Sequence, residues 1–129
     1  MALTLNGSTG LSGIVGSAGT PALQGGDTNT GYYFGTDILG LSTGGNTRLY
    51  IDSDGDVGIG VTSVLAPLHV FNAANNTIAR LESGDATCRL QLKDNTGEAY
   101  IAAIGDDLIL ANTSSITERL RIKSDGRVG

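Results

Sequence analysis

The sequence predicts an all-β fold of short strands joined by Gly-rich turns. Three observations support this class: the apolar residues come in short runs, several runs alternate strictly with polar residues, and 20 Gly stand against 2 Pro. Alternation at every second residue is the period of a half-buried strand. Gly distributed along a whole chain indicates many tight turns, because Gly tolerates positive φ.

Seven apolar runs are the predicted strands, at residues 38–41, 49–51, 57–61, 68–71, 88–92, 108–110 and 120–122. Three runs alternate most clearly, and we expect their apolar faces to be half-buried: Leu49 with Ile51, Cys88 with Leu90 and Leu92, and Leu120 with Ile122. Turn signals separate the runs at Asp54-Gly55, 83–85, 94–97 and Asp125-Gly126. Pro67 and Asn75-Asn76 argue against a helix in residues 63–81, where we also expect strands.

Composition and charge narrow the classes of function. The chain has no Trp and only 5% aromatic residues, so its interior must be built from Leu, Ile, Val and Ala, which suits thin layers better than one thick core. Its net charge of −5 repels phosphate groups, so nucleic acid is not an expected partner. No apolar run reaches 18 residues, and we therefore expect no membrane insertion.

An 11-residue segment occurs twice, at 48–58 and 119–129, with 8 identical positions and an offset of 71 residues. The identities fall on predicted inward apolar positions and on a Ser-Asp-Gly turn, and Ile38-Leu39 and Ile109-Leu110 keep the same offset upstream. A repeated unit that cannot bury its own apolar face is typical of stacked or elongated architectures. Because the second copy stops inside the motif, we expect the chain to be the front part of a longer polypeptide.

Two groups of residues resemble fibre proteins of tailed bacteriophages, above all those of marine and cyanobacterial phages. The N-terminal segments 2–10, 19–25 and 27–31 carry the first part of the resemblance. The segment TRLYIDSDGDVGIG at 47–60, followed by PLHV at 67–70, is similar to the shaft repeat of such fibres. In many of these proteins the shaft precedes a self-cleaving chaperone domain, a part that this sequence does not contain.

The resemblance implies an elongated, intertwined homotrimeric fibre of the β-prism or triple β-helix type. Residues 1–45 would form a virion-proximal N-terminal module and residues 46–129 a repeat-type β shaft. The implied role is structural: a tail fibre that is assembled in the host cytoplasm, anchors to tail, portal or capsid proteins of the virion, and presents distal receptor-binding parts. A head fibre and a host-glycan-binding adhesin module are the alternatives.

Asp52, Asp54 and Asp56 invite a calcium interpretation, because alternating carboxylates suit hard cations. The EF-hand spacing fails, since Gly occupies the fourth place of the loop and not the sixth. The repeat replaces the first and last of these acids by Lys123 and Arg127, which cannot bind a cation. We therefore favour a solvated turn and predict no metal, no cofactor, no catalytic residue and no enzymatic activity.

The remaining reactive residues are expected to have structural roles. His69, the only His, should be an outward strand residue, and Cys88, the only Cys, a small buried apolar one. The Asp106-Asp107 pair lies in a predicted turn, where carboxylates usually face water. The cluster Tyr32-Tyr33-Phe34 is either a strand at an interface or an exposed patch for glycan, and we favour the interface.

Overall fold

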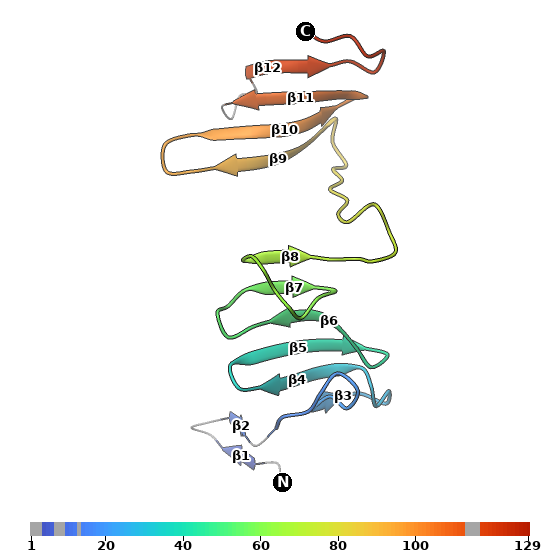
Figure 1. The fold of residues 1–129 in the computed structure, drawn as a ribbon, viewed down its shortest axis with the longest axis vertical. Helices are drawn as coiled ribbons and strands as arrows, with labels where there is room; N and C mark the ends of the chain where they lie inside the picture. Colours follow the sequence, from blue (N-terminus) through green and yellow to red (C-terminus); the bar gives the residue numbers. More distant parts are fainter. Residues whose placement is uncertain (1–3, 7–9, 13, 113–116) are drawn as a thin grey trace. The chain divides into compact units, whose positions relative to one another are not determined.

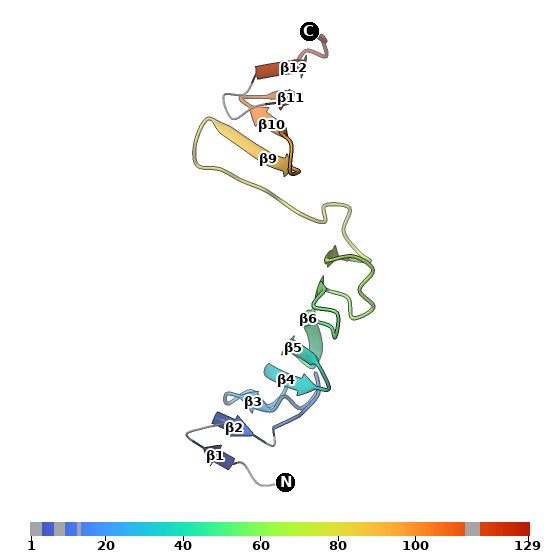
Figure 2. The same ribbon diagram turned by 90° about the vertical axis from the view of Figure 1, so that its left-hand side faces the viewer.

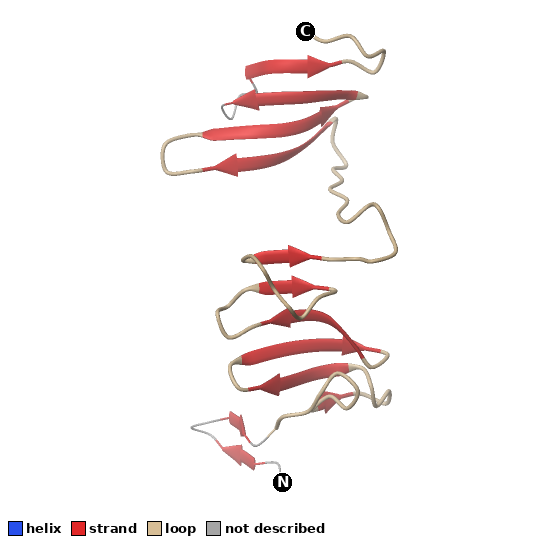
Figure 3. Cartoon of the chain, viewed as in Figure 1, coloured by secondary structure: helices blue, strands red, loops and turns tan. Residues whose placement is uncertain are grey.

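A computed structural model of the chain describes residues 4–6, 10–12, 14–112 and 117–129. These residues form an all-β fold, and no helix occurs within the described ranges (Figure 3). The chain divides into two compact units, Met1–Ile78 and Ala79–Gly129 (Figure 1). The predicted all-β class is thus confirmed, because alternation and turn chemistry are local signals that act within a few residues.

The first unit contains a two-stranded ribbon and a six-stranded sheet. The ribbon pairs β1 (Thr4–Asn6) with β2 (Gly10–Ser12) in antiparallel register. The sheet runs in chain order through β3 (Leu23–Gln24), β4 (Gly31–Gly35), β5 (Ile38–Thr43), β6 (Asn46–Ile51), β7 (Val57–Ile59) and β8 (Leu68–Val70). Neighbouring strands of this sheet are antiparallel, except that β7 and β8 are parallel to each other. The side view shows these strands following one another in a single layer (Figure 2).

The second unit is a four-stranded antiparallel sheet with the order β12-β11-β10-β9. Its strands are β9 (Thr87–Lys93), β10 (Glu98–Ile104), β11 (Asp107–Asn112) and β12 (Thr117–Ile122). The final residues return along the last strand, because Arg121 and Gly129 exchange two backbone hydrogen bonds of 2.7 and 2.9 Å.

Across the two units, all seven predicted apolar runs lie wholly or partly in strands.

The sequence repeat is a structural repeat. In the first copy, β5 and β6 pair Leu41 with Leu49, and a register shift follows between Leu41 and Ser42. In the second copy, β11 and β12 pair Leu110 with Leu120, and the shift falls at the equivalent place, between Leu110 and Ala111. Each copy is thus a strand, a bulge, a strand and a turn, followed by a short third strand or bridge.

The upstream part of the repeat is offset by 69 residues and not by 71. Leu39 pairs with Ile51 and Leu108 pairs with Ile122, so Leu108 and not Leu110 is the counterpart of Leu39. The connection 113–116 of the second copy is two residues longer than Gly44-Gly45 of the first, and this insertion changes the offset. The expected equivalence of Ile38-Leu39 with Ile109-Leu110 is therefore wrong.

Two further expectations differ from the structure. The boundary expected between residues 45 and 46 lies in the tight turn between β5 and β6, which pair within one sheet, whereas the compact units divide between Ile78 and Ala79. The repeat marks a recurring strand unit, and such a unit begins inside a sheet as readily as at its edge. Within residues 63–81 only β8 is a strand, because this irregular stretch has no second run of alternating apolar residues.

Candidate functional site

The most prominent surface of the second unit is one face of its sheet, which we call the second aliphatic face. The strand register places alternate side chains of β9, β10, β11 and β12 on this side of the sheet, and Asn112 lies at the margin of the face. Its apolar members are Cys88, Leu90, Leu92, Ala99, Ile101, Ala103, Leu108, Leu110, Leu120 and Ile122. The alternation predicted this face correctly for the residues of β9 and β12.

The second aliphatic face is largely uncovered. Leu92 is 53% exposed and Leu120 is half-buried, while Leu90, Ile101, Leu108, Leu110 and Ile122 are between 37% and 46% exposed. Leu90 and Leu92 are therefore more exposed than the prediction of a half-buried face for β9 implies, because within the described residues no second layer covers that side of the sheet. Large exposed apolar patches are often found at interaction sites of proteins.

The opposite face is the buried one, because long polar side chains lie over its apolar residues. Its core consists of Tyr100, Ala102, Ile109 and Ala111, which are at most 5% exposed. The Arg89 guanidinium lies 5.2 Å from the Tyr100 ring centroid, a cation–π arrangement. Gln91 Nε2 donates a 2.9 Å hydrogen bond to the Tyr100 hydroxyl, and burial raises the pKa of this phenol.

An ion cluster spans the same polar face between β11 and β12. Arg121 lies opposite Ile109 in the register, and its NH1 donates to Asp107 Oδ2 at 2.6 Å. Its Nε donates to Glu118 Oε2 at 2.9 Å, and its NH2 contacts the other oxygen of that carboxylate. These charge-assisted bonds hold the pKa of both carboxyls below the usual range and that of Arg121 above it.

The first sheet repeats this one-sided design. Its register gathers a first aliphatic face of Leu23, Tyr32, Phe34, Leu39, Leu41, Leu49, Ile51, Val57, Ile59, Leu68 and Val70. Tyr32 is 50% exposed and Leu68 is 63% exposed, while most of the other members are half-buried. On the opposite face Tyr33 and Ser42 are buried, and the Tyr33 hydroxyl lies 2.7 Å from Thr47 Oγ1.

Each aliphatic face has an arginine at its margin that sequence reasoning missed. Arg48 Nε donates to Thr43 Oγ1 at 2.7 Å, and Arg119 Nε donates to Asn112 Oδ1 at 2.8 Å. Both arginines lie at the register shift of their copy of the repeat. The sequence contains a signal for these arginines, because they are identical in the two copies although they are neither apolar nor part of the Ser-Asp-Gly turn.

The acidic loop of the first copy is an Asx-type turn. Asp52 Oδ1 accepts the backbone N–H groups of Asp54 at 3.0 Å and Asp56 at 2.9 Å, while the Gly55 N–H donates to the Asp52 carbonyl at 3.1 Å. The carboxylate of Asp52 therefore has a local structural use. No three His, Cys, Asp or Glu side chains gather as metal ligands would in the described part of the chain.

The structure separates the other residues that the sequence singled out. The Sγ of Cys88 lies 3.2 Å from the Leu81 carbonyl on the second aliphatic face, and the side chain is half-buried. His69 is also half-buried and not outward, and its Nδ1 has no hydrogen-bond partner within the described ranges. Asp106 is exposed as expected, whereas Asp107 is engaged by Arg121 and by the Ser124 N–H at 3.0 Å.

Strand alternation divides the aromatic cluster between the two faces of the first sheet. Tyr32 and Phe34 lie on the first aliphatic face, opposite Leu41 and Leu39, and Tyr33 is buried on the other side at 7% exposure. The three rings therefore do not form a single exposed patch. A glycan platform that requires all three is excluded by this arrangement.

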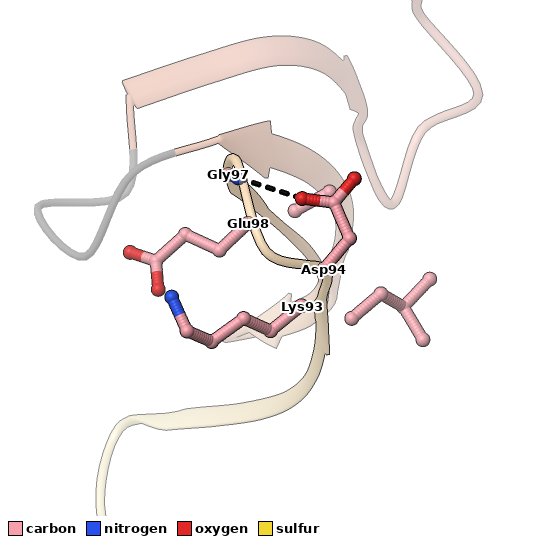
Figure 4. A pocket seen from close by; sticks show the side chains of 6 residues that line it. Lys93, Asp94, Gly97 and Glu98 are labelled. Atoms are coloured by element: carbon pink, nitrogen blue, oxygen red, sulfur yellow. Dashed lines mark hydrogen bonds between the residues drawn. The ribbon is translucent and has the colours of Figure 1, made fainter.

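A shallow hollow lies at the β9–β10 turn, lined by Leu92, Lys93, Asp94, Gly97, Glu98 and Ala99 (Figure 4). Asp94 Oδ1 accepts the backbone N–H groups of Thr96 and Gly97, both at 2.7 Å, and the Thr96 hydroxyl at 2.8 Å. These bonds, the one from the Thr96 N–H first, lower the pKa of Asp94. The carboxylate is thus used to close the turn.

Comparison of the sequence with protein-family models and with curated proteins finds no match. In the described ranges, no helix has the length and apolar character needed to cross a membrane. The two aliphatic faces are the most extensive exposed apolar features that the strand registers assemble.

Proposed function

We propose that this chain is a structural segment of a tailed-phage virion appendage, a tail fibre that works as a homotrimer. One observation carries the proposal: each sheet has an aliphatic face with large side chains that the single chain leaves exposed, while its buried side chains lie on the opposite face. Assembly of identical chains would bury these faces, which a lone chain leaves in water.

The repeated unit supports a mechanical role. Each copy contains the same bulge, the same marginal arginine and the same Asp-Gly turn, so the chain reuses one strand unit as a spacer does. Neighbouring units need only local contacts to stack, which permits length without a growing core. In the fibre, the N-terminal part of the chain would contact tail, portal or capsid proteins and the repeated strand units would belong to the shaft.

A role without catalysis accords with the placement of the carboxylates. Asp52 and Asp94 bond to backbone N–H groups of their own turns, and Asp107 is paired with Arg121. A glycoside hydrolase would need two free carboxylates facing each other across a cleft. The proposal therefore assigns these acids to stability.

Imaging of the intact particle tests the location. Antibody fragments raised against this chain should decorate the tail of the virion in electron micrographs. Decoration of the capsid surface would instead identify a head fibre. Absence of the chain from purified virions would contradict the proposal.

A further inference from the structure

We infer that copies of this chain pack against one another through the second aliphatic face, with the ion cluster of Arg121 turned toward water. The inference rests on the proposed homo-oligomer and specifies which surface forms its interior. The face has ten apolar members from four adjacent strands, and most of its large side chains are more than one-third exposed in the single chain.

The relief of this face suits interdigitation with a second copy. A central row of large side chains crosses all four strands: Leu90, Ile101, Leu110 and Leu120. On β10 the large Ile101 is flanked by Ala99 and Ala103, which are exposed and small. Small residues beside large ones leave space that leucines of another copy would fill, as in a well-packed core.

The chain exposes more surface than two compact units of its size would. The chain exposes 9029 Å². Two separate compact units with the lengths of Met1–Ile78 and Ala79–Gly129 would together expose about 7,700 Å², by the scaling of accessible surface with mass. The excess of about 1,300 Å² belongs to the whole chain, to which the second aliphatic face contributes, and it exceeds the ~800 Å² that each partner buries in a standard stable interface.

The distribution of charge favours another copy of the same chain as the occupant. The charged side chains of the polar face include Arg89, Glu98, Asp107, Glu118 and Arg121, whereas the ten apolar positions carry no charge. Identical copies bear identical charges, so a neutral surface is the one that they can bring together without repulsion. A membrane-binding face would instead be rimmed by Trp and by many Lys or Arg.

The first arm of the test compares two Leu→Lys variants. Leu110 lies at the centre of the face and is 40% exposed, and Leu65 lies in a loop and is 82% exposed. In the single chain both lysines would reach water. In the assembly, Leu110→Lys would bury three charges, so its dissociation constant should rise by about a hundredfold or more. Leu65→Lys should assemble as the parent does, and light scattering measures both.

The second arm uses the native thiol and needs no variant. Cys88 belongs to the face, opposite Ala103. A bulky maleimide should modify Cys88 at least about tenfold more slowly in the assembled chain than in the dissociated Leu110→Lys chain. The reason is that the reactivity of a thiol follows its accessibility to the reagent. If Leu110→Lys fails to fold, as judged by circular dichroism, the comparison is made between assembled and diluted parent protein.

The outcomes separate this inference from the proposed function. An assembled parent whose Cys88 reacts freely, or an assembled Leu110→Lys, would overturn the assigned face while leaving the homo-oligomer in place. A monomeric parent would contradict the proposed function itself. A parent chain that stays monomeric and binds phosphatidylcholine vesicles would overturn the inference in favour of a lipid surface.

Discussion

The ring of Tyr33 lies over Gly40, its partner across the β4–β5 pair, so closely that an ideal Cβ on Gly40 would overlap the ring. The hydroxyl at the end of the same ring is held 2.7 Å from Thr47 Oγ1. One residue of β4 therefore joins three strands on the polar face of the first sheet. The absence of a side chain at Gly40 is what permits this arrangement.

Gly40→Ala should destabilise the protein by about 2 kcal/mol per chain, because the added methyl displaces a buried ring and strains its hydrogen bond. Thermal unfolding followed by circular dichroism measures the loss. Gly97→Ala is the matched control, since a Cβ there meets no atom within 4 Å and its φ lies outside the left-handed region. Equal melting temperatures for the two variants would contradict the packing described.

Gly55 and Gly126 occupy equivalent turn positions with φ of +86° and +84°, and an added Cβ at either meets no atom within 4 Å. Alanine should therefore cost only the conformational strain, roughly 1 kcal/mol per chain and about 3 kcal/mol for three chains. Asparagine tolerates this conformation better, so Gly55→Asn should lose less than Gly55→Ala in chemical denaturation. Identical losses for Ala and Asn would show that the backbone conformation is not the cause.

Variants of the acidic turn distinguish a structural role of its carboxylates from a role in metal binding. Asp52→Ala should cost about 1 kcal/mol, because two backbone N–H groups lose their acceptor, and Asp52→Asn should lose less because it keeps an oxygen there. Asp56→Lys should be nearly silent, since Arg127 stands at that place in the second copy. Differential scanning calorimetry with and without chelator checks both claims. A chelator that lowers the melting temperature would restore the calcium interpretation.

Acid should weaken the second sheet through the Arg121 cluster. Arg121 lowers the pKa of Asp107 and Glu118 in the folded chain below their ordinary values of 3.8 and 4.5. A group with a depressed folded pKa stabilises the fold above its unfolded pKa, and the contribution is lost as the pH falls through the folded pKa. Melting temperature should therefore decline below about pH 4.5.

The variant Arg121→Gln should remove part of this acid dependence, because neither carboxyl then has a bound guanidinium. Arg80→Gln is the matched control. Arg80 pairs with Glu82 at 2.9 Å, but both side chains are at least 68% exposed, so that pair contributes little. If both variants show the acid profile of the parent, the cluster does not contribute to stability.

Strands and turns were predictable because their signals are local. Period-2 alternation located β6, β9 and β12, and Asp-Gly marked the positive-φ turns at Gly55 and Gly126. The engagement of Asp107 was not predictable, since its partner Arg121 is 14 residues away and reaches it only through the β11–β12 register. The 69-residue offset likewise depends on pairing that the sequence alignment of the two copies does not contain.

The direction of burial was the main point that sequence reasoning could not supply. An alternating strand has two faces, and a pattern of Leu90 and Leu92 against Arg89 and Gln91 indicates that the aliphatic side is the one to be covered. Within one chain the covered side is the other, because arginine and glutamine side chains lie over Tyr100. The pattern describes the assembled state if the aliphatic faces meet other copies.

The mass of the folded chain in solution tests the central claim most directly. Sedimentation equilibrium over a dilution series should give a species of three times 13.1 kDa, or about 39 kDa, because three chains bury aliphatic faces that one chain leaves exposed. A folded species of 13.1 kDa at every concentration, with a cooperative unfolding transition of its own, would contradict the account.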